Sequence, residues 1–275
     1  MPRIYLLITL IALALSACKK NKNTIPEPPP DLPAPAPVLL KDFTVANLPS
    51  PYYHFKYNEK KEITFASFGS GLLMYDVLYA DGKIAEMRSN TVVNKDTLRY
   101  SYNKDGLLDV VRYINENGAF RFCSFSYNNG KLTEAQWKLK TAAGLELERT
   151  VNLAYYEDGN VAKISDQKHA VAGRPESGHA TEFSQYDDKV NAGGFALLHD
   201  DGNSDHLLLY MQVALQKNNP GKLVFSNGMS DYQVDYTYTY DQKNQPLTRR
   251  GLVTMLSGPR EGEQFISNAT YSYYP

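Results

Sequence analysis

Hydrophobic and polar residues alternate along much of this chain, which is the pattern of β-strands that bury one face. In the stretch 145–155 one parity is apolar except for Arg149, and the other parity is mostly polar; the apolar members are Leu145, Leu147, Val151, Leu153 and Tyr155. Tyr236, Tyr238 and Tyr240 likewise share one face, opposite threonines. We therefore expect strands whose apolar faces point into a common core.

A short phrase recurs along the same region. An aromatic or aliphatic residue, a spacer and a tyrosine are followed by Asn or Asp with Gly nearby, as in the segment from Tyr100 to Leu107. Asn-Gly and Asp-Gly adopt the positive φ angles that tight hairpin turns require. A wider interval separates two of the copies and leaves room for one degenerate copy near 217–223. The repeat tyrosines are Tyr57, Tyr79, Tyr102, Tyr127, Tyr155, Tyr186, Tyr240 and Tyr273.

Each phrase predicts a β-hairpin, so the repeats predict an antiparallel meander of about 14–16 strands. Sheets with so many twisted strands tend to curl or split. We predict an all-β domain over 52–275, a large antiparallel meander of repeated hairpins curled into a half-barrel or partly closed barrel. Lys138 and Lys140 share one strand parity, which argues against the continuous apolar outer band of a membrane barrel.

The N-terminal segment has the layout of an export signal. A positive charge at Arg3 precedes an apolar run over 4–15, which is shorter than the roughly 20 residues of a spanning helix. The run ends in Leu15-Ser16-Ala17-Cys18, which resembles the lipobox of lipoproteins cut by signal peptidase II. We expect residues 1–17 to be removed and Cys18 to carry the lipid that attaches the protein to a membrane.

The residues after Cys18 bear on the side of attachment. Lys19 stands where an aspartate retains such proteins in the inner membrane, so the outer membrane is favoured. The stretch 19–23 lacks the acidic residues of surface-export signals, which favours the periplasmic face. Residues 18–51 are expected to be a linker, because seven of the twelve residues 26–37 are proline. This composition favours extended polyproline II, a spacer of roughly 37 Å.

Charge and cysteine content narrow the classes of function. The formal net charge is −1 and no basic stripe occurs, so a nucleic-acid partner is not expected. Because Cys18 is assigned to lipid, Cys123 has no partner for an intramolecular disulfide. Cys123 shares strand parity with Phe125 and Tyr127, which predicts a small buried side chain rather than a reactive thiol.

Several segments together resemble an uncharacterised family of Bacteroidota lipoproteins. They are the tyrosine-aspartate phrases, the segment Tyr186 to Asn191, the segment 217–220 and the closing stretch Tyr236 to Asp241. The resemblance covers roughly residues 52–275. It implies a porin-like β domain, distantly similar to the YD repeats of Rhs-type proteins, and an envelope address. That family has no established activity to carry over.

The densest polar stretch lies between 187 and 206. Asp201, Asn203 and Asp205 are spaced like the start of a calcium loop, in which alternating oxygen ligands converge on one cation. His206 replaces the usual glycine, however, and Gln212 replaces the glutamate at the twelfth position. A solvated loop of turn-forming residues is therefore the preferred interpretation, and these three residues remain weak metal candidates.

Other chemistry finds little support in the sequence. His199 and His206 match no standard zinc spacing, even with the neighbouring aspartates. Asp187 and Asp188 are adjacent, so on a strand they would face opposite sides and could not act as an acid and base pair. No nucleophile elbow, Cys-x-x-Cys or phosphate-binding glycine loop is present. We assign no catalytic residue and no cofactor, and a metal-dependent or carboxylate-based hydrolase on the 187–206 loops is the alternative function.

The chain has 21 tyrosines and one tryptophan, and two interpretations compete for them. Aromatic faces could form platforms for sugar rings, or they could stabilise hairpins as cross-strand ladders. The repeat-fixed positions favour the structural interpretation, and Trp137 is predicted to be core. The preferred function is a non-catalytic, membrane-anchored envelope module that binds a glycan, a lipid or another envelope protein.

Overall fold

A computed structural model describes residues 38–92, 95–191, 206–207 and 216–275. Every element lies in Val38–Pro275, which forms a compact unit by itself. The predicted signal peptide, Cys18 and the proline-rich stretch 26–37 lie outside the described residues. None of the helical segments in the described part of the chain could span a bilayer.

Strands form nearly all of the regular structure of the described residues, which also contain the 3-10 turn η1 (Gly69–Gly71). The strands are β1 (Leu40–Val45), β2 (Tyr53–Tyr57), β3 (Ile63–Phe68), β4 (Leu73–Ala80), β5 (Lys83–Ser89), β6 (Thr97–Tyr102), β7 (Leu108–Asn115), β8 (Gly118–Asn128), β9 (Lys131–Thr141), β10 (Gly144–Tyr155), β11 (Val161–Lys168), β12 (Ser177–Tyr186), β13 (Pro220–Ser226), β14 (Tyr232–Tyr240), β15 (Pro246–Met255) and β16 (Gln264–Tyr273).

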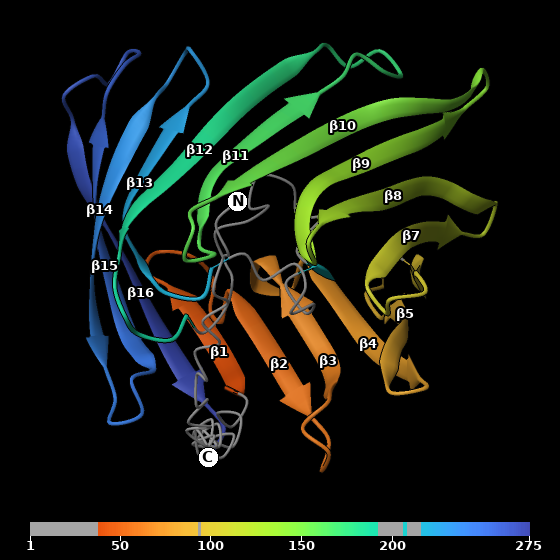
Figure 1. Cartoon of the computed structure of the whole chain (residues 1–275), viewed down its shortest axis with the longest axis horizontal. Helices are drawn as coiled ribbons and strands as arrows, with labels where there is room; N and C mark the ends of the chain where they lie inside the picture. The colour runs from red at the N-terminus through yellow and green to blue at the C-terminus, as the bar shows by residue number, and fades with distance from the viewer. Residues whose placement is uncertain (1–37, 93–94, 192–205, 208–215) are drawn as a thin grey trace, which may run out of the picture. The chain divides into compact units, whose positions relative to one another are not determined.

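Each strand pairs with the next one along the chain, and β16 pairs with β1 to close a barrel. Figure 1 shows the strands succeeding one another round the wall, with β16 returning beside β1. The predicted all-β meander is confirmed, at the upper end of the expected strand number. The folded domain begins before the boundary expected at Tyr52, because β1 lies within the segment expected to be linker and completes the closure.

The repeat tyrosines form a ring at one end of the barrel. The hydroxyl group of Tyr127 donates to the backbone carbonyl of Leu108 at 2.8 Å, and Leu108 is itself the cross-strand partner of Tyr102 in the preceding hairpin. In the same way, each of six further tyrosines donates from its hydroxyl group to a backbone carbonyl of the preceding hairpin, at donor to acceptor distances of 2.6 to 3.1 Å. They are Tyr57, Tyr102, Tyr155, Tyr186, Tyr238 and Tyr273. Tyr79 contacts the backbone at the equivalent position, Ile63, but there the phenol oxygen accepts a hydrogen bond from the N–H, which opposes the larger, raising effect of burial on the pKa of Tyr79. We call these eight residues the tyrosine ring.

The structural interpretation of the repeat tyrosines is thus confirmed, with two corrections. Tyr238 rather than Tyr240 bonds to the preceding hairpin, through the carbonyl of Pro220. The described part of the interval before it contains no further hairpin, because β12 pairs directly with β13. The segment predicted as a degenerate copy is instead the entry into β13, so the wide interval arises from a long connection between two neighbouring hairpins.

A β-bulge changes the facing of β10. Leu147 pairs with Lys138 and Arg149 pairs with Trp137, so Glu148 is an extra residue and the sides of the strand exchange there. Leu145 is consequently 56% exposed, and the prediction that it shares the buried face was wrong. Glu148 itself is buried, where its carboxylate accepts hydrogen bonds from Arg121 and Arg174.

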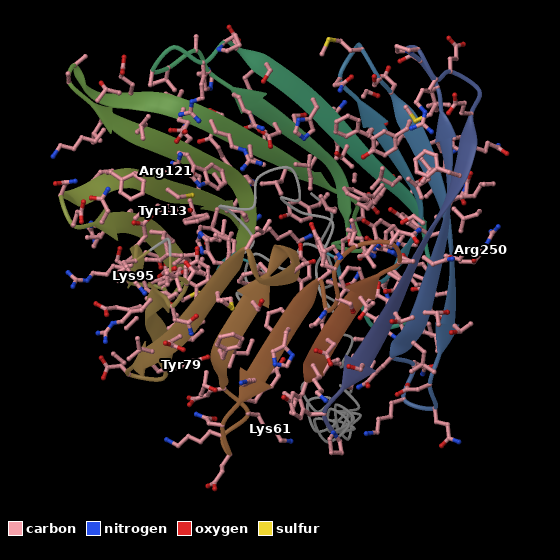
Figure 2. All side chains as sticks on the ribbon, turned by 180° about the vertical axis from the view of Figure 1, so that it is seen from behind. Lys61, Tyr79, Lys95, Tyr113, Arg121 and Arg250 are labelled. Carbon is pink, nitrogen blue, oxygen red and sulfur yellow. The ribbon has the colours of Figure 1, made fainter. Side chains whose placement is uncertain are left out.

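The inward side chains form the core. Trp137 and Cys123 are among the most buried side chains, as predicted. Outward side chains on the same strands are polar: Lys138 on β9 is exposed, and Lys163 on β11 pairs with Glu182 on β12. Figure 2 shows Arg250 of β15 on the outer side of the wall.

Candidate functional site

The interior of the barrel contains a cavity of about 370 Å³. Its walls come from strands β10 to β16, together with Asn191, Gln216 and Asn219 of the connection between β12 and β13. Ligand pockets in proteins commonly measure roughly 300 to 1,000 Å³, so the volume suits a small molecule. The residues that line it include Arg149, Asp166, His179, Phe225, Tyr232, Val234, Tyr236, Tyr238, Arg249, Val253, Met255 and Ser267.

Strand alternation explains which side chains reach the cavity. On β14 the cavity-lining positions are Tyr232, Val234, Tyr236 and Tyr238, and every intervening residue faces outward. β15 contributes Arg249, Val253 and Met255 by the same period of two. The sequence of each strand therefore determines one stripe of the cavity wall.

A buried ion pair forms one side of the wall. Asp166 on β11 accepts hydrogen bonds from Nε of Arg149 at 2.9 Å and a further one from a terminal nitrogen of its guanidinium. The two side chains are each 3% exposed. The guanidinium also lies over the ring of Trp137, 4.8 Å from its centroid. Because both charges are satisfied locally, this pair contributes polarity and shape to the cavity but little net charge.

Three rings form a stack beside that pair. The ring of His179 lies 5.0 Å from that of Phe225, and Phe225 in turn stacks on Tyr232 at 4.8 Å with an interplanar angle of 16°. Nε2 of His179 is 3.8 Å from a carboxylate oxygen of Asp166. The wall thus presents flat apolar surface that ends in a polar group, an arrangement that suits an elongated ligand with an apolar body.

The opposite side of the cavity holds a second inward arginine, Arg249 on β15. Its guanidinium lies 5.0 Å from the ring centroid of Tyr236 and 5.4 Å from that of Phe43. Among the described residues no carboxylate lies within ion-pair distance of it. Cation–π contacts contribute about 0.5–2 kcal/mol each, whereas removing an ion from water costs several kcal/mol. Arg249 is half-buried, so its guanidinium stays partly accessible from the cavity, and the rings offset part of a desolvation cost that is itself only partial.

Small residues open the space next to Arg249. Gly251 and Ser267 are cross-strand partners, and Gly251 is also the partner of Tyr236. A Cβ atom on Gly251 would come within 2.8 Å of Val234 and 3.0 Å of the Tyr236 ring. The glycine thus allows the Tyr236 ring to lie against β15 beside the guanidinium.

The arginine and carboxylate side chains among the described lining residues are Arg149, Asp166 and Arg249. Because the first two neutralise each other, Arg249 is the arginine of the described lining that has no carboxylate beside it. Arginine is not deprotonated in proteins, so this charge persists at every accessible pH.

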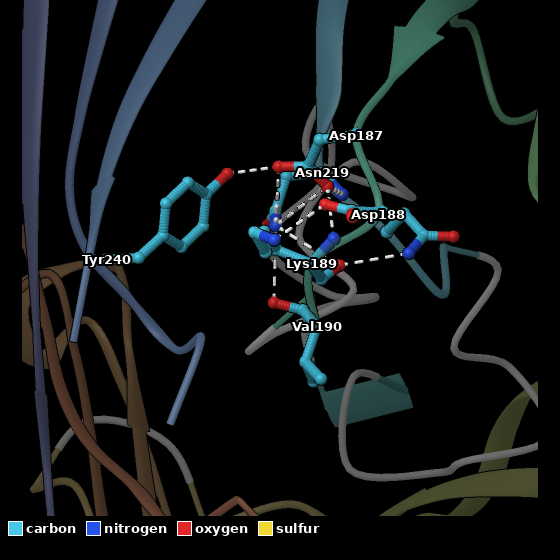
Figure 3. A network of polar contacts seen from close by, with 7 residues as sticks. Asp187, Asp188, Lys189, Val190, Asn219 and Tyr240 are labelled. Atoms are coloured by element: carbon cyan, nitrogen blue, oxygen red, sulfur yellow. Dashed lines mark hydrogen bonds and ion pairs between the residues drawn. The ribbon is translucent and has the colours of Figure 1, made fainter. Parts of the chain in front are cut away.

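Asp187 and Asp188, which begin the polar stretch singled out in the sequence, lie in the connection between β12 and β13. Asp187 accepts hydrogen bonds from the backbone and side-chain nitrogens of Asn219 and from the hydroxyl group of Tyr240 (Figure 3). Asp188 is exposed and pairs with Lys189 at 2.8 Å. The two adjacent aspartates have separate partners, although they follow the end of β12 rather than lying on a strand, and Asp187 fixes the two ends of the connection between β12 and β13.

His206 lies inside the barrel, where its ring nitrogens contact two tyrosines. Nδ1 is 2.7 Å from the hydroxyl group of Tyr100, and Nε2 is 2.8 Å from that of Tyr113. With both ring nitrogens engaged and 1% of the residue exposed, His206 serves as a buried anchor. Of the residues considered for a hydrolase site on the 187–206 loops, Asp187, Asp188 and His206 thus have separate hydrogen-bond partners, and 192–205 lie outside the described residues.

Several candidates cannot be placed. Cys18, His199 and the weak metal candidates Asp201, Asn203 and Asp205 lie outside the described residues. In the part of the chain that is described, no group of three or more His, Cys, Asp or Glu residues could hold a metal ion.

Sequence patterns gave only part of the cavity. Arg149 stood out as the one polar residue on an apolar parity, but Asp166 and Arg249 were not singled out. Arg249 carries a similar signal, because it shares parity with Val253 and Met255 on β15.

Two solved structures share this fold. A porin-like protein from Bacteroides uniformis is 16% identical with a TM-score of 0.58, over 81% of this chain and 89% of that one. A porin-like protein from Bacteroides vulgatus is 15% identical with a TM-score of 0.57, over 86% of this chain and 99% of that one. At these identities the likeness concerns the fold alone. No family model matches the chain, and no curated protein matches its sequence.

Proposed function

We propose that this chain is a lipid-anchored envelope protein whose barrel holds a small molecule in its internal cavity without transforming it. The cavity between β10 and β16 carries the proposal, because it combines ligand-sized volume, stacked aromatic surface and a few convergent polar groups. The porin-like neighbours support an envelope location, and the lipobox at Cys18 supports attachment by lipid.

The outer face of the barrel supports attachment by a lipid anchor rather than by insertion of the strands. A membrane barrel presents an apolar band to the hydrocarbon. Here the outward stripe of β9 carries Glu134, Gln136 and Lys138, and Arg99 on β6 forms an exterior ion pair with Glu86. These side chains suit water, so the anchor on Cys18 would supply the membrane affinity, on the periplasmic face of the outer membrane.

The test is binding of N-phenyl-1-naphthylamine, an uncharged aromatic probe whose fluorescence rises in apolar surroundings. Residues 38–275 contain every described element and form the material for the assay, after circular dichroism confirms β structure. Ser267→Trp fills the cavity and should weaken binding at least tenfold. Asn268→Trp, on the adjacent outward position of β16, should leave binding unchanged.

The proposal is contradicted if the wild-type barrel does not bind the probe, or if the two tryptophan variants bind equally well. A ligand of biological origin would then be sought by native mass spectrometry of protein isolated from its own envelope. Turnover of that ligand by the barrel would contradict the non-catalytic part of the proposal.

A further inference from the structure

Arg249 indicates which class of molecule the cavity accepts. Its guanidinium lies between the rings of Tyr236 and Phe43, at a wall of the cavity, with no carboxylate beside it among the described residues. By contrast, the other inward arginine, Arg149, is closely paired with Asp166. One strongly basic group inside the barrel is therefore left to be satisfied by something other than the described side chains.

The surroundings of Arg249 orient it toward the cavity. Its cross-strand partners are Tyr238 on β14 and Ala269 on β16, and the short side chain of Ala269 leaves room for the guanidinium to reach Phe43 on β1. Both rings lie at cation–π distance from the guanidinium, and its N–H donors have no carboxylate acceptor among the described residues.

A second donor lies at the same place. Tyr236 is cross-strand to Gly251, and no hydrogen bond of its hydroxyl group is found among the described residues. Other tyrosines of the barrel end, such as Tyr238, are committed to backbone carbonyls. The hydroxyl of Tyr236 can thus add a hydrogen bond to an acceptor that is held by Arg249.

We propose that the cavity binds amphipathic organic acids, with the anionic head on Arg249 and Tyr236 and the apolar body along Phe225 and Tyr232. This inference rests on the proposed binding function and specifies its ligand class. A planar guanidinium matches carboxylate, sulfonate and phosphate groups through paired N–H donors, and such charge-assisted bonds are about twice as strong as neutral ones. An anion would also neutralise the charge of Arg249, which has no carboxylate beside it among the described residues.

The test uses two probes with the same ring skeleton. 8-Anilinonaphthalene-1-sulfonate differs from N-phenyl-1-naphthylamine by one sulfonate group, so their dissociation constants separate recognition of the head from recognition of the body. The wild-type barrel should bind the sulfonate roughly tenfold more tightly or better, equivalent to about 1.4 kcal/mol or more. Arg249→Gln should remove this preference, so that the variant binds the two probes with similar affinity.

Matched variants keep the test independent of folding. Arg249→Lys retains the charge and should retain part of the preference. Arg250→Gln removes the neighbouring outward charge and should have no effect. Tyr236→Phe should weaken the sulfonate about two- to fivefold and leave the uncharged probe unchanged. In competition, dodecanoate should displace the bound probe more strongly than dodecanol, which shows whether a carboxylate serves as well as a sulfonate.

Each result has a definite meaning. Equal affinity for the two probes in the wild type, or a preference that survives in Arg249→Gln, overturns the inference while the binding function stands. Failure of both probes to bind overturns the binding function together with it. A preference that depends on Arg249 and is lost in Ser267→Trp supports both.

Discussion

Removal of one hydroxyl group from the tyrosine ring should destabilise the barrel by a defined amount. Tyr127→Phe deletes the donor to the carbonyl of Leu108 and keeps the ring in place. The equivalent changes are Tyr102→Phe, which loses the bond to Ile84, and Tyr155→Phe, which loses the bond to Leu132. Phenylalanine also retains the contact of Lys83 with the ring at position 102.

The magnitude follows from one hydrogen bond per substitution. A net contribution of about 1 kcal/mol, within a range of about 0.5–1.5, is typical of a bond between neutral groups in a partly buried place. The three tyrosines lie on alternate strands, two strand spacings or roughly 9–10 Å apart, so their effects should add. We therefore expect the triple variant to lose about 3 kcal/mol of unfolding free energy, a large part of the total for a domain.

The assay is equilibrium unfolding in urea. Trp137 is the only tryptophan of the sequence and is buried, so its fluorescence reports loss of the core, and circular dichroism reports loss of the sheet. Tyr236→Phe is the control, because it removes a hydroxyl with no hydrogen bond in the described part of the chain. The control should change the free energy of unfolding by less than about 0.5 kcal/mol.

Two results would refute this account. A triple variant that loses less than about 1 kcal/mol would mean that water replaces the ring hydroxyls at no cost. A control that loses as much as Tyr127→Phe would mean that any tyrosine hydroxyl in the barrel contributes equally, and that the ring has no special part in holding the hairpins together.

Three further predictions concern the ion pair, alkaline stability and the anchor. Asp166→Asn leaves Arg149 buried without its carboxylate and should cost about 3–5 kcal/mol of unfolding free energy in urea titrations; a loss below about 1 kcal/mol would contradict it. Burial raises the pKa of Tyr79 to about 12, above the ordinary value of 10. Because the folded-state pKa is the higher one, stability should be complete below pH 10 and fall as pH rises toward 12, seen as a lower Tm together with tyrosinate absorbance at 295 nm; an unchanged Tm over that range would contradict it. Cys18→Ala should abolish incorporation of labelled palmitate and release the protein from membranes, while labelling of the variant would disprove lipidation at this residue.

The hairpins and their turns were predictable from the sequence. In the segment from Tyr102 to Gly106, the tyrosine, the Asx residue and the glycine together specify a hairpin, because their conformational requirements are satisfied within a few residues. The same local chemistry repeats, so the strand number and the meander followed from it. Barrel closure did not, since β1 pairs with a strand more than 200 residues away and no turn phrase accompanies Leu40–Val45.

The contacts in the cavity wall could not be predicted from the sequence, because they depend on the register between neighbouring strands. The bulge at Glu148 exchanges the faces of β10, and the pairing of Arg149 with Asp166 exists only in the register that the bulge produces. Nothing in either strand alone specifies that offset. The charge of Arg249 on an apolar strand parity can be read from the sequence, but which side chains surround it depends on β14, β16 and β1, and among the described residues these place no carboxylate beside it.

The two parts of the barrel use one hairpin unit in different ways. From β1 to β9 the inward positions hold large apolar side chains such as Phe68, Met87 and Trp137, which are buried in one hydrophobic core. From β10 to β16 the same positions include Arg249 and the small pair of Gly251 and Ser267, and a cavity results. The tyrosine ring and the turns bind backbone at the barrel end, so the hairpins stay in register whatever the mid-strand positions carry. Substitution at the cavity wall should therefore alter which ligand binds while the fold persists. For this reason, a difference between Arg249→Gln and Arg250→Gln would report on ligand recognition and not on folding.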